Sequence, residues 1–530
     1  MKVDNIYFSN TNLFSALVID FIENKENTKS FYNYNNTSFD IELCIEHKKN
    51  ENIDRELLAS AIQHQYQHIS DKVVLVDENI ELLKLDNSFC IVTAHQLNVF
   101  TGPLYYIYKI AQTIATCHQL KQQYSNYNFI PIYWMGSEDH DFAEINHINL
   151  FNKKIEWNDA QSGATGIFST ENILLLIDEI KNILGEQTYT SEIIQLFKDA
   201  YAQENLTKAT RFLVNKLFGN YGLVVVDGND SVFKKQFSNI MLDDLKNHNA
   251  FRLVEQTNKA LTEHNYKSQA TVREINLFYL KDNLRERIVF DADKNTYQVL
   301  NTTITFTEEQ IQTELNTHPE RFSPNVILRP LFQQKILPSI AYIGGAGEIA
   351  YWLQLKTTFE FYKINFPILL LRNSALLLTE NINKRIEKLN LNIIDFFADV
   401  DVIKRKYIDG FNQFDIAEEK ENMLAQFKSI QSKIDGIDSS LVGFLGAEQN
   451  KLEKSLETIE AKVLKSLKQK NENSLNQIEK VYQQIFPNQN LQEREENFSV
   501  YYAKYGQSFI DNLIKNFDVF NQQFLIISLD

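Results

Sequence analysis

The sequence predicts an α/β protein with a parallel sheet at its core and a long helical arm toward its C-terminal end. Two short apolar segments, 89–92 and 129–133, are typical of buried parallel strands, and one helix-length pattern separates them. Because strand–helix–strand crossovers are right-handed, they make their two strands parallel. Residues 415–485 instead repeat apolar side chains at heptad spacing, which is typical of a coiled coil.

The first part of the chain, residues 1–156, is expected to hold N-terminal helices and the first half of the sheet core. Residues 1 to about 80 place apolar side chains on repeating helical faces. In the crossover helix, Pro103 suits the first helical position and Gly102 the cap before it. Apolar residues then recur at near-helical spacing: Ile107, Ile110, Ile114 and Leu120.

The middle of the chain continues the alternation of helix and strand. Residues 157–205 are predicted to be a helical insertion, and residues 206–380 the second half of the core. A helix that ends at 212–218 leads into a short buried strand at 222–227. Short strands separated by turns predict a small antiparallel β insertion around 270–300.

A compact third unit follows. It consists of a strand at 340–343, the turn Gly344-Gly345-Ala346-Gly347, a helix from Glu348 to about Tyr362 and a strand at 366–371. Prolines fix turns, and five of the eight in the chain lie in or just before this unit: Pro319, Pro324, Pro330, Pro338 and Pro367. These prolines predict rigid turns around a functional surface.

The heptad segment 415–485 is predicted to be a helical hairpin. Gly443 and Gly446 lie where a helix would most easily break and fold back. Two interpretations stay open, an intramolecular helical layer and a coiled coil that makes a homodimer. Pro487 ends the arm, and residues 486–530 are expected to pack on the core.

Composition excludes several classes of function. The net charge of −16 argues against a broad nucleic-acid surface, which needs a basic face. Three widely separated cysteines without a C-x-x-C pair indicate a reducing compartment and no thiolate zinc site. A signal-peptide pattern and an apolar run of membrane-spanning length are both lacking, so a cytoplasmic protein is expected.

Polar residues directly follow the first two predicted strands. His95 and Gln96 come after the first, and Glu138-Asp139-His140-Asp141 after the second. The carboxyl ends of parallel strands share one edge, where open α/β proteins bind ligands. Gly102, at the start of the crossover helix, offers a further anion site.

The acidic cluster has two interpretations. Carboxylates and an imidazole this close together perturb one another, which favours a site for a cation or a cationic substrate. The alternative is a helix start, where acidic side chains are favourable. His140, His147 and Glu144 match no closed zinc pattern, so no metal site is predicted.

Glycines and arginines elsewhere add candidates. Gly344 and Gly345 could either cradle a ligand or allow tight packing of helix on strand, and they do not form a dinucleotide fingerprint. Arg273, Arg329 and Arg372 lie in apolar surroundings, where a cation needs an anionic partner. That partner could be the acidic cluster or a carboxylate or phosphate of the substrate.

Together these motifs resemble the bacillithiol biosynthesis cysteine-adding enzyme family, BshC, along essentially the whole chain. The resemblance is carried by the following segments: Thr101-Gly102-Pro103-Leu104-Tyr105, Gly136 to Phe142 with Asn146-His147, Arg273-x-x-Asn276-Leu277-Phe278, Arg329-Pro330, Leu337-Pro338, Gly344-Gly345 with Glu348-x-x-Tyr351-Trp352, Arg372-Asn373-Ser374 and Leu491-Gln492-Glu493-Arg494. One departure is Ala94, where the family pattern favours glycine.

The resemblance implies a Rossmann-like core related to class I aminoacyl-tRNA synthetases, with connecting-peptide insertions and a coiled-coil arm that makes dimers. The implied activity is that of a ligase, which joins L-cysteine to the amine of glucosaminyl-malate in the last step of bacillithiol synthesis. The implied pocket for substrate or nucleotide holds Thr93, Gln96, Gly102, Tyr105, Asp139, Arg273, Arg329, Gly344, Gly345, Glu348, Tyr351, Trp352, Arg372, Asn373 and Ser374.

The mechanism is left open by the resemblance. The H-x-G-H and K-M-S-K-S motifs of class I synthetases are lacking, so ATP with its Mg ion is a hypothesis for the activating cofactor. His95, Gln96 and His140 are expected to position the substrates, and Arg273 or Arg372 to hold the malate or cysteine carboxylate. Asp141 or Glu138 is expected to deprotonate the attacking ammonium, because only a neutral amine is nucleophilic.

Two other functions fit the same residues. A nucleotide-sugar transferase would also use a Rossmann-like core with an acidic edge. A dimeric scaffold or cysteine-delivery partner could keep such a site without catalysis.

Overall fold

The computed structural model describes residues 2–36, 40–69, 73–411, 414–518 and 520–529. The chain divides into two units. The core unit comprises Val3–Leu376 and Asn490–Ile526, and the arm unit comprises Leu377–Gln489 with the two chain ends. Among the helices of these described ranges, none is both long and apolar enough to cross a lipid bilayer.

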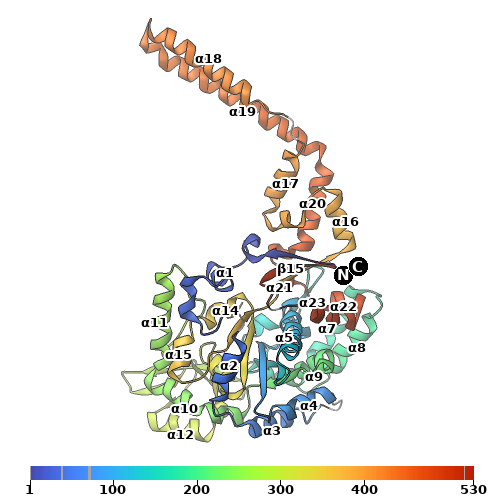
Figure 1. Ribbon diagram of the computed structural model, residues 1–530, viewed down its shortest axis with the longest axis vertical. Coiled ribbons are helices and arrows are strands. Elements are labelled where there is room, and N and C mark those ends of the chain that lie inside the picture. The colour runs from blue at the N-terminus through green and yellow to red at the C-terminus, as the bar shows by residue number, and fades with distance from the viewer. Residues whose placement is uncertain (1, 37–39, 70–72, 412–413, 519, 530) are drawn as a thin grey trace. The chain divides into compact units, whose positions relative to one another are not determined.

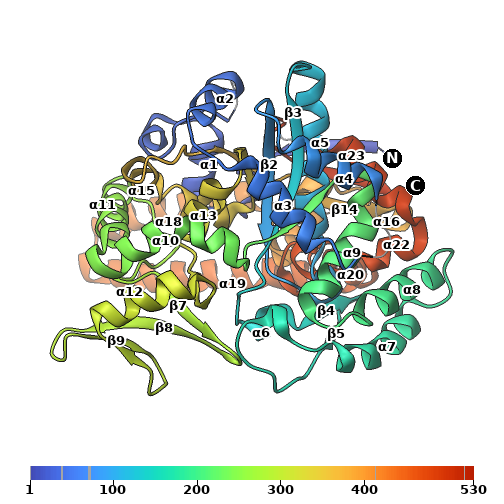
Figure 2. The ribbon, with the colours of Figure 1, turned by 90° about the horizontal axis from the view of Figure 1, so that it is seen from below.

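A parallel five-stranded sheet forms the centre of the core unit. Its strand order is β13 (Ile368–Leu371), β12 (Ser339–Gly344), β2 (Ser88–His95), β3 (Asn128–Met135) and β6 (Val224–Asp227). The strands are buried along nearly their whole length, as expected of a sheet with helices on both faces. Figure 2 shows β2 and β3 side by side, in the parallel register of a crossover unit. This architecture confirms the predicted fold class.

The crossover helix α5 (Leu104–Gln123) connects β2 to β3. Pro103 does not take the first helical position as predicted but is the cap residue, with an extended backbone. The reason is a contact with the C-terminal segment: Pro103 forms a β-bridge with Asn497, and the Leu104 amide donates to the Glu496 carbonyl. Gly102 precedes it with φ at +61°, a region that favours glycine.

The N-terminal segment is helical only in pieces. After strand β1 (Lys2–Tyr7) the longer helices are α1 (Ala16–Ile22), α2 (Ile41–Lys49), α3 (Arg55–Gln65) and α4 (Val74–Leu82). The helices α2 and α5 cover the sheet, and Ile41 and Ile45 pack with Phe89, Ile91 and Leu370 in one apolar cluster.

Between β3 and β6 the chain forms short and long elements. A turn of helix, α6 (Phe142–Ile145), leads into the hairpin β4 (His147–Leu150) and β5 (Lys153–Glu156). The helices α7 (Leu174–Leu184), α8 (Thr190–Tyr201) and α9 (Leu206–Phe218) then return the chain to the sheet.

A second, antiparallel sheet follows α10 (Ser231–Asn247) and α11 (Asn249–Glu263). Its strand order is β10 (Thr305–Phe306), β9 (Thr296–Val299), β8 (Leu284–Asp291), β7 (Leu277–Lys281) and β11 (Phe322–Pro324). Helix α12 (Glu308–Thr317) begins with a capping box at Thr307 and Gln310.

The remaining elements of the core unit are short. Helix α13 (Arg329–Ile336) precedes β12, and the predicted single helix 348–362 is two helices, α14 (Ala346–Trp352) and α15 (Lys356–Phe361). The chain leaves the core unit within β14 (Ala375–Thr379). It returns at residue 490 to form α21 (Gln492–Glu495), α22 (Ser499–Tyr505), α23 (Gln507–Asn516) and β15 (Gln523–Leu529).

The arm unit is helical: α16 (Glu380–Lys388), α17 (Val400–Asp409), α18 (Ala417–Asp435), α19 (Val442–Lys470) and α20 (Glu472–Ile485). Helices α18 and α19 lie side by side as a hairpin, joined by an ion pair between Lys420 and Glu460 at 2.6 Å (Figure 1). The turn lies at 436–441, where the Asp438 carboxylate accepts from the Ser440 amide. The prediction of a break at Gly443 and Gly446 is therefore wrong, because both lie within α19.

Candidate functional site

A cavity of about 930 Å³ lies at the carboxyl edge of β2, β3 and β12, within the core unit. Polar and apolar side chains contribute to its walls. The predicted residues that line it are His95, Gln96, Tyr105, Glu138, Asp139, Arg329, Gly345, Glu348, Tyr351 and Arg372. The sheet topology thus brings together side chains that are far apart in the sequence.

The other predicted residues are not part of its lining: Thr93, Gly102, His140, Asp141, Arg273, Gly344, Trp352, Asn373 and Ser374. Thr93 donates from its hydroxyl to the Ile343 carbonyl at 2.9 Å and holds two strands together. Trp352 is fully buried and stacks on Tyr342 and Phe359. Arg273 is exposed outside the cavity, so its proposed contact with substrate has no support in the structure.

The end of β2 supplies His95 and Gln96. The imidazole of His95 packs against Tyr105 and Tyr106, with ring centroids 5.3 Å away in each case. Burial and then the nearby Lys109 ammonium lower the pKa of His95 from 6.5 to about 3. His95 is therefore neutral at physiological pH and suited to positioning a substrate by hydrogen bonding.

Gln96 connects two carboxylates. Its side-chain amide donates to Asp139 Oδ2 at 2.9 Å and to Glu144 Oε2 at 2.8 Å. Glu144 lines the cavity and is a residue that sequence reasoning considered only as a metal ligand. Its place in the cavity follows from α6, which begins directly after the acidic cluster.

The acidic cluster divides between the cavity and the second sheet. Glu138 lies 2.5 Å from the ammonium of Lys234, whose side chain is fully buried. Burial raises the pKa of Asp139, but Arg285, the Asp141 amide and Gln96 outweigh that effect and hold it below its usual value. Both carboxylates therefore meet a protein cation.

His140 and Asp141 are the members of the cluster that turn away from the cavity. Nδ1 of His140 lies 2.6 Å from the Arg285 guanidinium, and its ring packs against Phe278. Asp141 is exposed. His140 therefore packs against Phe278 and Arg285 of the second sheet instead of lining the cavity. Asp141 does not line the cavity either, so the structure does not support it as the base.

Glu348 forms an ion pair with the buried Lys109, which sequence reasoning missed. Its carboxylate accepts from Lys109 Nζ at 2.7 Å, the Gly345 amide at 2.8 Å and the Tyr342 hydroxyl at 2.5 Å. These partners outweigh burial and lower its pKa to about 2. Lys109, a lone cation among apolar residues of α5, was the available signal for such a partner.

Arg372 also has an internal partner. Glu493, fully buried, accepts from the Arg372 guanidinium at 2.6 Å, the Ser374 hydroxyl at 3.1 Å and the Ala375 amide at 3.0 Å. The partner is therefore neither the acidic cluster nor a substrate anion alone. Asn373 likewise faces inward, where its amide N–H donates to Gln112.

The predicted anion site at the start of α5 is filled by the protein itself. The Asn497 side chain donates to the carbonyls of Phe100 and Gly102. A Cβ atom at Gly102 would lie 2.7 Å from the Asn98 side chain, so this glycine is needed for packing. The Leu104 amide, the first of the helix, donates to the Glu496 carbonyl at 2.8 Å, so the C-terminal segment uses an N–H group that was expected to bind a phosphate.

The glycines of the turn before α14 differ in how much free space surrounds them. A Cβ atom at Gly344 would lie 3.0 Å from Glu348 and Tyr342, which indicates tight packing. At Gly345 the nearest atoms would be 3.5 Å away, and at Gly347 3.8 Å away. Gly345 and Gly347 line the cavity, so the space beside them is open to a ligand.

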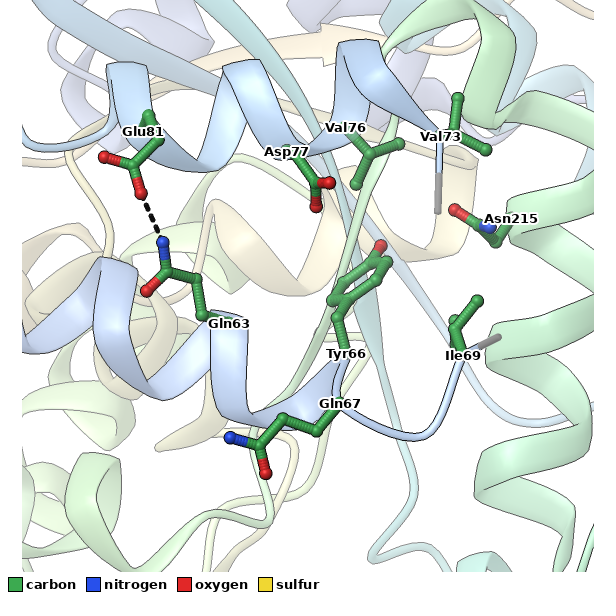
Figure 3. Close-up of a pocket in the computed structure, with 9 residues that line it drawn as sticks. All are labelled: Gln63, Tyr66, Gln67, Ile69, Val73, Val76, Asp77, Glu81 and Asn215. Carbon is green, nitrogen blue, oxygen red and sulfur yellow. Dashed lines mark hydrogen bonds between the residues drawn. The ribbon is translucent and has the colours of Figure 1, made fainter. Parts of the chain in front are cut away.

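A second hollow of about 330 Å³ lies between α3, α4 and α9 (Figure 3). Tyr66 and Asn215 face into it, and Gln63 donates to Glu81 at one end. None of the predicted site residues lines it. Across the described ranges, no group of three or more His, Cys, Asp or Glu side chains is placed to hold a metal ion.

Comparison with known proteins identifies the family. Residues 1–373 match the family model described as "Bacillithiol biosynthesis BshC, N-terminal Rossmann-like domain", and residues 375–529 match the corresponding "C-terminal coiled-coil domain". The chain belongs to the BshC family. This membership confirms the resemblance seen in the sequence.

Relatives in the BshC family match along their full length. A protein of Flavobacterium johnsoniae named "Putative cysteine ligase BshC" is 41% identical over 100% of both chains. Proteins with the same name from Flavobacterium psychrophilum and Bacillus cytotoxicus are 41% and 27% identical, each over 97% of this chain and 97% and 98% of their own. That name agrees with the predicted enzyme class, a ligase.

Among solved structures, a Campylobacter jejuni chain titled as a putative arginyl-tRNA synthetase matches 87% of this chain and 98% of its own. The sequence identity is 12% and the TM-score is 0.25.

Proposed function

We propose that the protein is a ligase that joins the carboxyl group of L-cysteine to the amine of glucosaminyl-malate. The observation that carries this proposal is the charge distribution in the cavity. Its lining includes the carboxylates Glu138, Asp139 and Glu144 and also the guanidinium groups Arg285, Arg329, Arg372 and Arg494. Such a cavity suits substrates that carry both ammonium and carboxylate groups.

The acidic residues supply an ammonium site. Gln96 holds Asp139 and Glu144 together through its amide, which fixes two acceptors toward one region. A substrate ammonium placed there would be stabilised by both carboxylates. The neutral His95 ring borders the same end of the cavity and can orient the substrate without competing for the proton.

The base is assigned to Glu144. Glu138 is paired with Lys234, and Asp139 is near Arg285, whereas no described cation lies within 4.0 Å of Glu144. Glu144 is also exposed enough to return its proton to water. It would take one proton from the attacking ammonium and leave a neutral amine, the form that attacks a carboxyl carbon.

Amide formation from a carboxylate also requires that one oxygen leaves. ATP with Mg, when bound, would supply the energy and accept that oxygen. Arg494, whose guanidinium is exposed in the cavity, is the cation suited to its phosphates, since Arg372 is paired with Glu493 and the start of α5 is closed. The phosphates would then contact an arginine side chain that lines the cavity.

A reaction of the purified full-length protein tests the proposal. We expect a cysteinyl amide of glucosaminyl-malate, detected by mass spectrometry, from cysteine, glucosaminyl-malate and ATP. Glu144→Gln should lower kcat by about 10²–10⁴-fold, the usual contribution of a general base. The matched control Asp141→Asn, in the same loop but outside the cavity, should retain most activity.

Other outcomes would point elsewhere. Consumption of a nucleotide-sugar instead of cysteine would favour a transferase. Absence of product under every cofactor condition, together with tight binding to another biosynthetic protein, would favour the scaffold.

We also propose that the arm makes a homodimer. The hairpin of α18 and α19 buries none of its described side chains in one chain. Apolar side chains remain exposed along it: Met423, Ile430, Leu441, Phe444 and Ile459. A second copy of the hairpin would cover them.

A further inference from the structure

The arginines of the cavity differ in how their charge is balanced. Arg372 lies 2.6 Å from Glu493, and Arg285 lies 3.9 Å from Asp139. Arg494 is exposed, so water balances its charge. Arg329 is partly buried, and among the residues that the structure describes no carboxylate lies within 4.0 Å of it.

Arg329 has only neutral hydrogen-bond partners. As the first residue of α13, it donates to Gln333 Oε1 at 2.9 Å and to the Tyr351 hydroxyl at 3.3 Å. Its guanidinium also lies 5.8 Å from the centre of the Tyr342 ring. These contacts fix the orientation of the guanidinium but leave its charge unbalanced, which is costly away from water unless an anion is bound.

The guanidinium remains charged in this place. Burial lowers the pKa of Arg329, but Tyr351, Tyr342 and Glu348 outweigh that effect and raise it above its usual value. The carboxylate of Glu348 already accepts hydrogen bonds from Lys109, Gly345 and Tyr342. A ligand anion is therefore the remaining partner for Arg329.

Open space lies beside the helix that carries Tyr351. Neither Gly345 nor Gly347 has a backbone conformation that demands glycine, and neither would clash internally with a Cβ atom. Gln269, whose side chain is 3.8 Å from the Cβ position of Gly347, lines the same part of the cavity. A ligand group can thus approach the backbone of this turn closely.

We propose that Arg329 and Tyr351 form a subsite for a carboxylate of the malate group, with Gln269, Gly345 and Gly347 shaping its walls. This inference rests on the proposed function and assigns a place within it. The malate carboxylates remain charged from substrate to product. The cysteine carboxylate becomes a neutral amide carbonyl, so a strong ion pair to it would stabilise the ground state and oppose the reaction.

Binding measurements with the full-length protein test the subsite independently of turnover. The probes are glucosaminyl-malate and methyl glucosaminide, which keeps the amine but has no carboxylate, each titrated by calorimetry. Arg329→Gln should weaken binding of glucosaminyl-malate by about 10- to 100-fold, as expected for a lost charge-assisted contact, and leave methyl glucosaminide unchanged. Arg329→Lys should lose less, because it keeps the charge without the forked geometry.

Two controls separate binding from folding. Arg252→Gln removes an exposed guanidinium on α11 and should leave both affinities unchanged. Thermal unfolding of Arg329→Gln and Arg329→Lys should show that both variants are folded. The KM for cysteine should stay within about twofold of the wild-type value in Arg329→Gln.

Three results with the Arg329→Gln variant would overturn the subsite. These are unchanged binding of glucosaminyl-malate in Arg329→Gln, an equal loss for both probes, and a loss confined to cysteine or ATP, which would assign the anion to another substrate. Wild-type protein that binds neither probe would also overturn it. Selective binding without product in any variant would instead leave the subsite standing and contradict the proposed ligase reaction.

Discussion

At the scale of single residues, the main feature of the site is that several charges are balanced inside the protein. Lys109 balances Glu348, Lys234 balances Glu138 and Glu493 balances Arg372. These pairs position the walls of the cavity and reduce the number of groups free to meet a substrate. Glu144 and Arg329 have no such counterion among the described residues, and the proposals above rest on them; Arg494 also lacks one but is exposed to water.

The ion pair between Lys109 and Glu348 should contribute to stability. Lys109→Met should lower the free energy of unfolding by at most about 3–5 kcal/mol, because it leaves a partly buried carboxylate, 25% exposed, without its cation. The double variant Lys109→Met, Glu348→Gln should recover part of this loss. Urea unfolding followed by circular dichroism measures both, and equal losses in the single and double variants would contradict the pairing.

The same pair predicts a pH dependence. The pKa of Glu348 is about 2 in the folded state against 4.5 ordinarily, so its contribution is fully present above about pH 4.5. That contribution should be lost as the pH falls from 4.5 toward 2. Glu348→Gln should reduce the slope of unfolding free energy against pH in this window, and an unchanged slope would contradict the shift.

The lowered pKa of His95 also predicts a loss of stability at low pH. Its pKa is about 3 in the folded state against 6.5 ordinarily, so the unfolded chain takes up a proton first as the pH falls. His95 should therefore cost stability progressively below about pH 6.5. His95→Gln should flatten the stability profile between pH 6.5 and 4.5, and an unchanged profile in this variant would contradict the shift.

At the scale of elements, the C-terminal segment completes the core. Asn497 holds the turn before α5, Glu496 accepts from the amide that begins α5, and Glu493 holds the end of β13. These contacts bring residues nearly 400 positions apart in the chain to one edge of the sheet. The arm separates them in sequence, and only the folded core reunites them.

This arrangement predicts the effect of removing Asn497. Asn497→Ala should lower the free energy of unfolding by about 1–3 kcal/mol, because it leaves the buried carbonyls of Phe100 and Gly102 without a donor. Asn512→Ala, which removes one hydrogen bond within α23, should cost less. Chemical denaturation compares the two, and equal losses would show that the turn does not depend on Asn497.

At the scale of the whole molecule, the arm hairpin presents an apolar surface that one copy of the chain leaves exposed. Phe444 and Ile459, both on α19, are 66% and 47% exposed. Heptad surfaces of this kind associate when a second copy is available. The core unit has its own sheets and apolar cluster and does not need the hairpin for its interior.

We therefore expect a dimer at micromolar concentration in light scattering. Phe444→Glu with Ile459→Glu should convert it to a monomer, because charges would then lie in the apolar surface. Val402→Glu changes an exposed apolar residue of α17 outside the hairpin and should leave the dimer intact. A monomeric wild-type protein, or a dimer unaffected by the double substitution, would contradict the proposal.

Local patterns in the sequence determined the parallel sheet, the crossover at 89–133 and the helical arm. Each depends on spacing between neighbours, since buried strands are continuously apolar and helices repeat every 3.6 residues. The convergence of His95, Gln96, Glu138 and Asp139 was predictable too, because parallel strands end at one edge. The hairpin turn was misplaced because two glycines, at about 1 kcal/mol each, weaken a helix of 29 residues without ending it.

Only the tertiary structure decided which charges are available to a ligand. The sequence marks Glu348, Arg372 and the start of α5 as candidates, but their partners Lys109, Glu493 and Asn497 come from distant elements. It also cannot show that His140 turns toward Arg285 of the second sheet. The physical reason is that a buried charge is balanced by whichever opposite charge the fold brings within a few ångströms, and that distance depends on packing, not on separation along the chain.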